Sequence, residues 1–125
     1  MIKRLLYLEI AVRNLQKSID WYSKILGFEV CRRIENEDGP WCQMKTGSDD
    51  SLALWQDPNG VPAQEHPNQQ TFFPIFQVDN LPQVVQELSA KEANILEPIR
   101  ERKGYKITTI ADPDGNKLQL VEVTH

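Results

Sequence analysis

The chain has 125 residues, of which 40% are hydrophobic and 26% charged, a composition typical of one globular domain with a buried core. Its net charge of −4 at pH 7 leaves no basic surface for phosphate groups, which argues against a nucleic-acid partner. No run of about 18 apolar residues occurs, and no signal-peptide cleavage site follows the N-terminus, so we expect a cytoplasmic protein with no membrane partner.

The first half of the chain predicts elements in the order β-α-β-β-β. An alternating apolar segment over residues 4–12 predicts a strand. Asn14 is a good N-cap for a helix with apolar residues at helical spacing, and Gly27 is placed to end that helix. Three further strands, separated by polar turns, are predicted over residues 28–34, 41–46 and 51–56.

The second half repeats this order after a long connection. Residues 58–70 are rich in proline and nearly free of large apolar residues, which indicates a linker or a functional loop. A strand over 71–78 and a helix that Asn80 caps and Ala93-Asn94 closes come next. Three strands follow, over residues 94–99, 105–111 and 117–123, with an exposed hairpin turn predicted at 100–103.

One offset of 66 residues aligns the two halves. Residues 12–15 match residues 78–81, and residues 52–54 match residues 118–120. Coincidence among ordinary strand residues is the alternative, but a single offset that holds at both ends of each half favours a true repeat. We therefore expect a single domain over residues 1–125, with module one at 1–57, a loop at 58–70 and module two at 71–125.

These features resemble a known family. The repeat, the helix region over residues 12–28 and the Asp-Pro-Asp-Gly-Asn sequence at 112–116 are similar to the vicinal oxygen chelate superfamily, the glyoxalase, bleomycin-resistance and dioxygenase group. The resemblance implies an α+β fold of two β-α-β-β-β modules whose sheets curl around a cavity. It also implies a homodimer with the partner chain at or near each cavity, and leaves open whether the modules pair within one chain or across the dimer. The fold hosts both enzymes and binding proteins.

The resemblance also implies where a divalent metal would be bound in the enzymes. The ligands are expected seven residues before each helix cap and at the centre of each module's last strand, which here are Tyr7, Phe73, Ala53 and Gln119. A divalent cation needs imidazole, carboxylate or thiolate ligands. Alanine and phenylalanine offer no donor atom, and the phenol and the amide are weak neutral donors. We therefore expect no metal, no cofactor and no catalytic residue; a non-standard site built from Glu9 and His66 is the alternative.

Strand alternation predicts a cavity face with aromatic walls and a few polar groups. Its members are Tyr7, Glu9, Trp41, Ala53, Trp55, Phe73, Ile75, Tyr105 and Gln119. Such a lining suits a small organic molecule, and the carboxylate favours a cation, although aromatic side chains can also simply fill a core. We expect a binding protein similar to the metal-free bleomycin-resistance proteins, rather than an enzyme. A lyase, isomerase or dioxygenase with a non-standard metal site is the alternative.

The two cysteines give no sign of nucleophilic chemistry. Cys31 and Cys42 have no histidine near them in the sequence, and without an export signal we expect both thiols to be reduced. Each is expected to act as a small apolar side chain.

Overall fold

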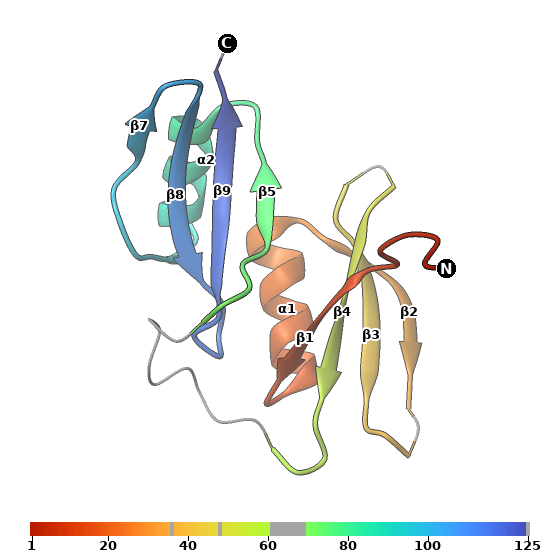
Figure 1. Cartoon of the computed structure of the whole chain (residues 1–125). Helices are drawn as coiled ribbons and strands as arrows, with labels where there is room; N and C mark the ends of the chain where they lie inside the picture. Colours follow the sequence, from red (N-terminus) through yellow and green to blue (C-terminus); the bar gives the residue numbers. More distant parts are fainter. Residues whose placement is uncertain (36, 48, 61–69, 125) are drawn as a thin grey trace. The chain divides into compact units, whose positions relative to one another are not determined.

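The computed structural model describes residues 1–35, 37–47, 49–60 and 70–124, which contain two α-helices and nine strands (Figure 1). The chain divides into two units, Met1–Ala63 and Gln64–His125, and each has its own sheet. The predicted α+β fold class is confirmed. None of the described helices is long and apolar enough to cross a membrane.

The sheet of unit 1 has four strands in the spatial order β1-β4-β3-β2. β1 runs parallel to β4, and the other two pairs are antiparallel. In chain order the elements are β1 (Leu8–Val12), α1 (Leu15–Leu26), β2 (Glu29–Ile34), β3 (Trp41–Lys45) and β4 (Ser51–Gln56).

The sheet of unit 2 follows the same plan, with the order β5-β9-β8-β6 and an extra strand, β7, beside β8. The first and last strands are again parallel. In chain order the elements are β5 (Ile75–Gln77), α2 (Leu81–Ala90), β6 (Asn94–Ile95), β7 (Arg100–Arg102), β8 (Tyr105–Ala111) and β9 (Lys117–Val123).

Each helix buries an apolar stripe against one face of its own sheet. In α1 the buried apolar residues are Leu15, Ile19 and Tyr22, at the spacing that puts them on one side of a helix. Leu52 and Leu54 are buried on the facing side of β4. Because side chains alternate along a strand, Ser51, Ala53 and Trp55 must point to the opposite face, away from α1. That opposite face is where unit 1 holds its pocket.

Two side chains accept hydrogen bonds from N–H groups at the N-terminus of each helix. Asn14 accepts a hydrogen bond from the Lys17 N–H at 3.0 Å, as an N-cap does. Gln56, at the end of β4, accepts one from the Leu15 N–H at 2.7 Å. Both contacts recur 66 residues later. Asn80 accepts from the Gln83 N–H at 3.1 Å, and Glu122 accepts from the Leu81 N–H at 2.7 Å.

The register of the parallel strand pairs follows the same offset. Glu9 lies opposite Ala53 in unit 1, and Ile75 lies opposite Gln119 in unit 2. Each last strand is thus aligned with the first strand of its unit in the same way. The two positions differ in chemistry. In unit 1 the carboxylate Glu9 lies beside the small Ala53, whereas in unit 2 the apolar Ile75 lies beside the amide Gln119.

Two predicted first strands are shorter in the structure. β1 begins at Leu8 rather than at residue 4, because Leu8 pairs with Leu52 near the start of β4 and earlier residues have little partner strand left. β5 begins at Ile75 rather than at residue 71. Pro74 has no N–H to donate to a ladder, although its carbonyl accepts the Gln119 N–H at 2.9 Å.

The prediction for residues 94–103 was partly wrong. Arg100–Arg102 is a strand that pairs with β8, not an exposed turn, and the turn follows it at Lys103 and Gly104. The strand predicted over 94–99 is limited to Asn94–Ile95. Pro98 lies in the gap between the two short strands, where a missing N–H donor breaks a ladder.

Candidate functional site

A pocket of about 390 Å³ lies in unit 1, on the sheet face that points away from α1. Its walls come from β1 to β4, from Tyr7 just before β1 and from the turn between β2 and β3. The lining residues are Tyr7, Glu9, Arg32, Ile34, Asp38, Gly39, Trp41 and Trp55. The structure therefore brings four of the residues singled out from the sequence, Tyr7, Glu9, Trp41 and Trp55, to one place.

Strand register arranges the pocket face in two rows across the sheet. One row is apolar and consists of Ile34, Trp41, Trp55 and Ala11. The next row has a charged residue at each end and consists of Arg32, Gln43, Ala53 and Glu9. Aromatic faces and opposite charges are thus available on neighbouring parts of the same surface.

Trp41 reaches across the sheet to Glu9. Its indole Nε1–H donates to the Glu9 carboxylate at 2.9 Å, and its ring lies 5.8 Å from the Tyr7 ring at a tilt of 56°. Because β4 lies between β3 and β1, the Trp41 side chain must pass over β4 to make this contact. That path explains why Ala53 on β4 is completely buried although its face of the sheet carries a pocket.

Trp55 is held by the turn before β3. Its indole Nε1–H donates to the backbone oxygen of Asp38 at 2.6 Å. Gly39 allows this turn to lie against β4, since it has a φ of 108° and a Cβ there would collide with the backbone oxygen of Gln56. Both indole N–H groups of the pocket are therefore engaged within the chain, which leaves the ring faces as the surfaces that a ligand can contact.

Ala53, which was predicted to bind a ligand, is not one of the residues that line the pocket, and it is completely buried. Its small size has a clear role, since a methyl group leaves room for the Trp41 ring to cross β4. Gln43, its neighbour in the row, donates a hydrogen bond to the Ser51 hydroxyl at 2.9 Å.

The remaining residues predicted to bind a ligand belong to unit 2. Ile75 and Gln119 lie side by side on β5 and β9, and Thr109 lies opposite Gln119 on β8. Phe73, Ile75 and Tyr105 are exposed, with Ile75 the most exposed of them at 60%. That Phe73, Ile75, Tyr105 and Gln119 bind a ligand stays a prediction.

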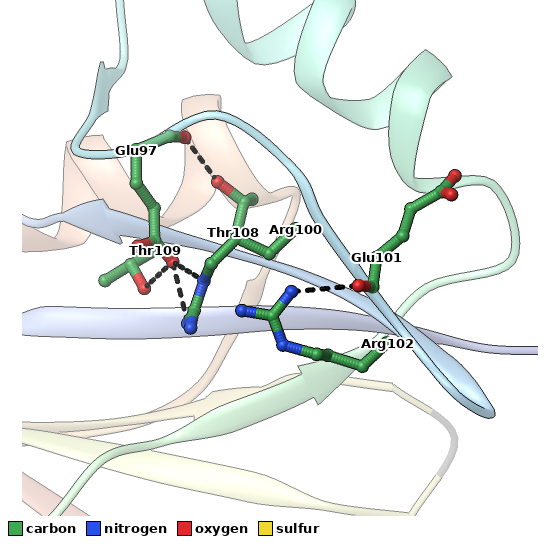
Figure 2. Close-up of polar contacts among 6 residues, drawn as sticks. All are labelled: Glu97, Arg100, Glu101, Arg102, Thr108 and Thr109. Carbon is green, nitrogen blue, oxygen red and sulfur yellow. Dashed lines mark hydrogen bonds and ion pairs between the residues drawn. The ribbon is translucent and has the colours of Figure 1, made fainter.

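A polar cluster that the sequence did not suggest lies beside Thr109 in unit 2 (Figure 2). The Glu97 carboxylate accepts a hydrogen bond from the Thr109 hydroxyl at 3.0 Å and pairs with the Arg100 guanidinium at 3.1 Å. The Thr108 hydroxyl donates to the Glu97 backbone oxygen at 2.8 Å. The charge of Arg100 is therefore neutralised within unit 2. A glutamate three positions before an arginine indicates an ion pair only in a helix, and this segment is not helical, so nothing in the sequence indicated the cluster.

The residues at the implied metal positions do not fit a divalent cation. Ala53 and Phe73 have no donor atom, and Tyr7 and Gln119 supply only a phenol and an amide. Within residues 1–35, 37–47, 49–60 and 70–124, no three His, Cys, Asp or Glu side chains are grouped so that they could hold a metal ion. His66, part of the alternative site, lies outside the described residues.

The two cysteines differ in environment and are both free thiols. Cys31 is exposed, at the irregularity where β2 shifts register between Val30 and Arg32. Cys42 is completely buried on the helix side of β3. Burial raises the pKa of the Cys42 thiol, which the nearby Arg33 only partly offsets. A buried thiol that resists ionisation is suited to packing rather than to nucleophilic attack.

The sequence did not predict half of the residues that line the pocket: Arg32, Ile34, Asp38 and Gly39. Arg32 and Ile34 alternate on β2, a sign that they share a face, but the irregularity at Cys31 decides which face that is. Asp38 and Gly39 were recognisable only as turn residues. Their role in the pocket depends on the close approach of the turn to β4.

Comparison with known proteins agrees with this architecture. The sequence model of the Glyoxalase/Bleomycin resistance protein/Dioxygenase superfamily matches residues 4–120. A lactoylglutathione lyase of Escherichia coli O157:H7 is 27% identical over 125 residues, which cover 95% of this chain and 92% of that protein.

Solved structures of low sequence identity share the fold. A glyoxylase/bleomycin resistance protein/dioxygenase domain from Frankia sp. EAN1pec has a TM-score of 0.84 at 17% identity, with 99% of this chain and 100% of that chain covered. TnmS3, an antibiotic binding protein from Streptomyces sp. CB03234, has a TM-score of 0.80 at 21% identity, with 98% of each chain covered. With the family model matching nearly the whole sequence, the chain belongs to the Glyoxalase/Bleomycin resistance protein/Dioxygenase superfamily.

Proposed function

We propose that this protein binds a small organic molecule with an aromatic ring in the pocket of unit 1, without a metal ion. The observation that carries the proposal is the placement of Tyr7, Trp41 and Trp55 around one pocket, with both indole N–H groups already hydrogen-bonded. Ring faces fixed in this way offer stacking and apolar burial at little cost in side-chain freedom.

The donor set and one of the relatives support this proposal. The four positions where the family resemblance implies metal ligands hold two side chains with no donor atom and two weak neutral donors. TnmS3, which shares the fold, is described as an antibiotic binding protein. Antibiotic binding is thus a property of one structural neighbour of this chain.

An enzyme of the lyase or isomerase type with a non-standard metal site is the second candidate. The observation in its favour is the 27% identity to a lactoylglutathione lyase over 95% of this chain. Metal content, measured by mass spectrometry on protein purified without chelators, separates the two functions. We expect less than about a tenth of an equivalent, because two weak donors do not hold a divalent cation. Near-stoichiometric metal together with turnover would favour the enzyme.

The role of the pocket is tested by removing one indole. We expect Trp55→Ala to weaken the binding of 6-amino-2-naphthoate, an aromatic probe, by about tenfold or more, because tryptophans that contact a bound partner often contribute most of the binding free energy. Titration calorimetry measures the effect. Trp21→Ala is the matched control, since Trp21 lies on α1 against Tyr22 and not in the pocket. Equal affinities for the two variants would contradict the proposed site.

The family resemblance also leads us to propose a homodimer. Light scattering at micromolar concentration is expected to give twice the chain mass of 14.4 kDa. A measured mass equal to that of one chain would contradict the dimer.

A further inference from the structure

Arg32 is a charged residue of the pocket wall that has no partner within the described part of the chain. Neither a hydrogen bond nor an ion pair involves its guanidinium there, although it lines the pocket. The adjacent Arg33, on the other face of β2, donates to Gln16 at 2.8 Å and lies 3.7 Å from the Glu35 carboxylate. An arginine carries five N–H donors in a planar fork that matches a carboxylate. Arg32 therefore offers an unused anion-binding group at the pocket.

Glu9 provides the opposite charge at the far end of the same row. Arg32, Gln43, Ala53 and Glu9 lie on four adjacent strands, which are spaced about 4.8 Å apart, so the outer two Cα atoms are separated by about 14 Å. One Glu9 oxygen accepts from Trp41, and the other has no partner among the described residues. The second carboxylate of the wall, Asp38, already has a contact within the chain.

Aromatic side chains border the row that joins these two charges. Trp41 crosses the sheet toward Glu9, and Trp55 stands in the adjacent row. A molecule that touches both charged ends must therefore extend across the sheet along a ring face. The Arg32 and Glu9 side chains span part of the distance between β2 and β1. The ligand must be long enough to span most of the rest.

We infer that the ligand is an elongated, flat aromatic molecule with an oxyanion at one end and an N–H group at the other. Arg32 binds the oxyanion, and the free oxygen of Glu9 accepts the N–H, while the indole faces hold the rings. The inference rests on the proposed function, because it assumes that the pocket binds an aromatic molecule. It adds the chemistry of the two ends and names Arg32 as the residue that selects for the anion.

Three probes test this assignment. 6-Amino-2-naphthoate has a carboxylate and an amine at opposite ends of a rigid bicyclic ring, its methyl ester lacks the negative charge, and 2-naphthoate lacks the amine. We expect the natural sequence to bind 6-amino-2-naphthoate about tenfold more tightly than the ester, the gain typical of a charged hydrogen bond. 2-Naphthoate is expected to bind more weakly than 6-amino-2-naphthoate. Titration calorimetry gives all three affinities.

Two substitutions at adjacent positions identify the residue. Arg32→Gln is expected to remove the preference for the carboxylate, so that acid and ester bind equally, while the affinity for the ester stays unchanged. Arg33→Gln, which removes the same charge from the other face of β2, is expected to keep the tenfold preference. Circular dichroism on both variants checks that each is folded.

The possible results separate this inference from the proposed function. If Arg32→Gln keeps the preference, or if the acid and the ester bind the unchanged protein equally, the assignment of Arg32 is overturned while aromatic binding survives. If none of the three probes binds, or if Trp55→Ala leaves their affinities unchanged, the proposed function fails and this inference fails with it.

Discussion

Replacing Ala53 with glutamate is expected to destabilise unit 1 by about 3 kcal/mol. Ala53 is completely buried beneath the path that Trp41 takes to Glu9, and Glu9 is its direct neighbour on β1. The new carboxylate would be buried next to a like charge and would displace the Trp41 ring. Urea unfolding followed by tryptophan fluorescence measures the loss, because Trp21, Trp41 and Trp55 are the three tryptophans of the chain and all lie in unit 1.

Gln119→Glu is the matched control for this substitution. Gln119 is the corresponding central residue of β9, half-buried and paired with the exposed Ile75, so the same new charge is expected to cost less than about 1 kcal/mol. Its unfolding is followed by circular dichroism, since unit 2 has no tryptophan. An equally small cost for Ala53→Glu would show that Trp41 does not cover this position.

Tyr22→Ala is expected to cost about 3–5 kcal/mol of the free energy of unfolding, the usual range for deleting a buried aromatic ring. Tyr22 is completely buried in α1, its ring stacks on Phe28 at 6.0 Å, and it meets the Trp21 ring edge-on at 4.8 Å. Removing the ring leaves a cavity where α1 packs on the sheet. Urea unfolding monitored by tryptophan fluorescence reports the change directly.

Tyr22→Phe separates the ring from its hydroxyl group. The phenylalanine variant keeps the stacking with Phe28, so we expect most of the stability to remain. If Tyr22→Ala unfolded at nearly the same urea concentration as the unchanged protein, the ring would not be part of the core that holds α1.

Local signals in the sequence were enough to predict much of the fold. The bounds of α1 follow from Asn14 as N-cap and from Gly27, whose φ of 75° places it in the left-handed region that ends helices. The strands Ser51–Gln56, Tyr105–Ala111 and Lys117–Val123 have the predicted bounds, because their apolar alternation is strong. Both kinds of signal are contained within a few consecutive residues.

Features that depend on a distant partner could not be predicted. The start of β1 is set by its pairing with β4, and β7 exists because Arg100–Arg102 finds a partner in β8. Neither pairing can be recognised from the residues of the strand itself. Charged residues predict exposure but say nothing about pairing, and Arg100–Arg102 is an edge strand that is both exposed and hydrogen-bonded to β8.

The candidate site was predictable in part for the same reason. Alternation from Leu52 and Leu54 places Trp55 on the pocket face, and the structure agrees. The contact between Trp41 and Glu9 spans three strands, and the facing of Arg32 depends on an irregularity in β2, so both require the folded register. Binding by the predicted residues of unit 2, among them Tyr105 and Gln119, remains a prediction.

The hydrogen bonds that Gln56 and Glu122 make to the helix N-termini set an order of events during translation. On the ribosome, α1 emerges before β4, so the Leu15 N–H lacks its strand partner until Gln56 has been synthesised. Once that residue has emerged, every helix and strand that the structure describes in unit 1 has been synthesised, before any strand of unit 2. In the same way, the Leu81 N–H of α2 has no strand partner until Glu122 has been synthesised. In each unit, the acceptor for the helix N-terminus therefore lies on the strand that is synthesised last.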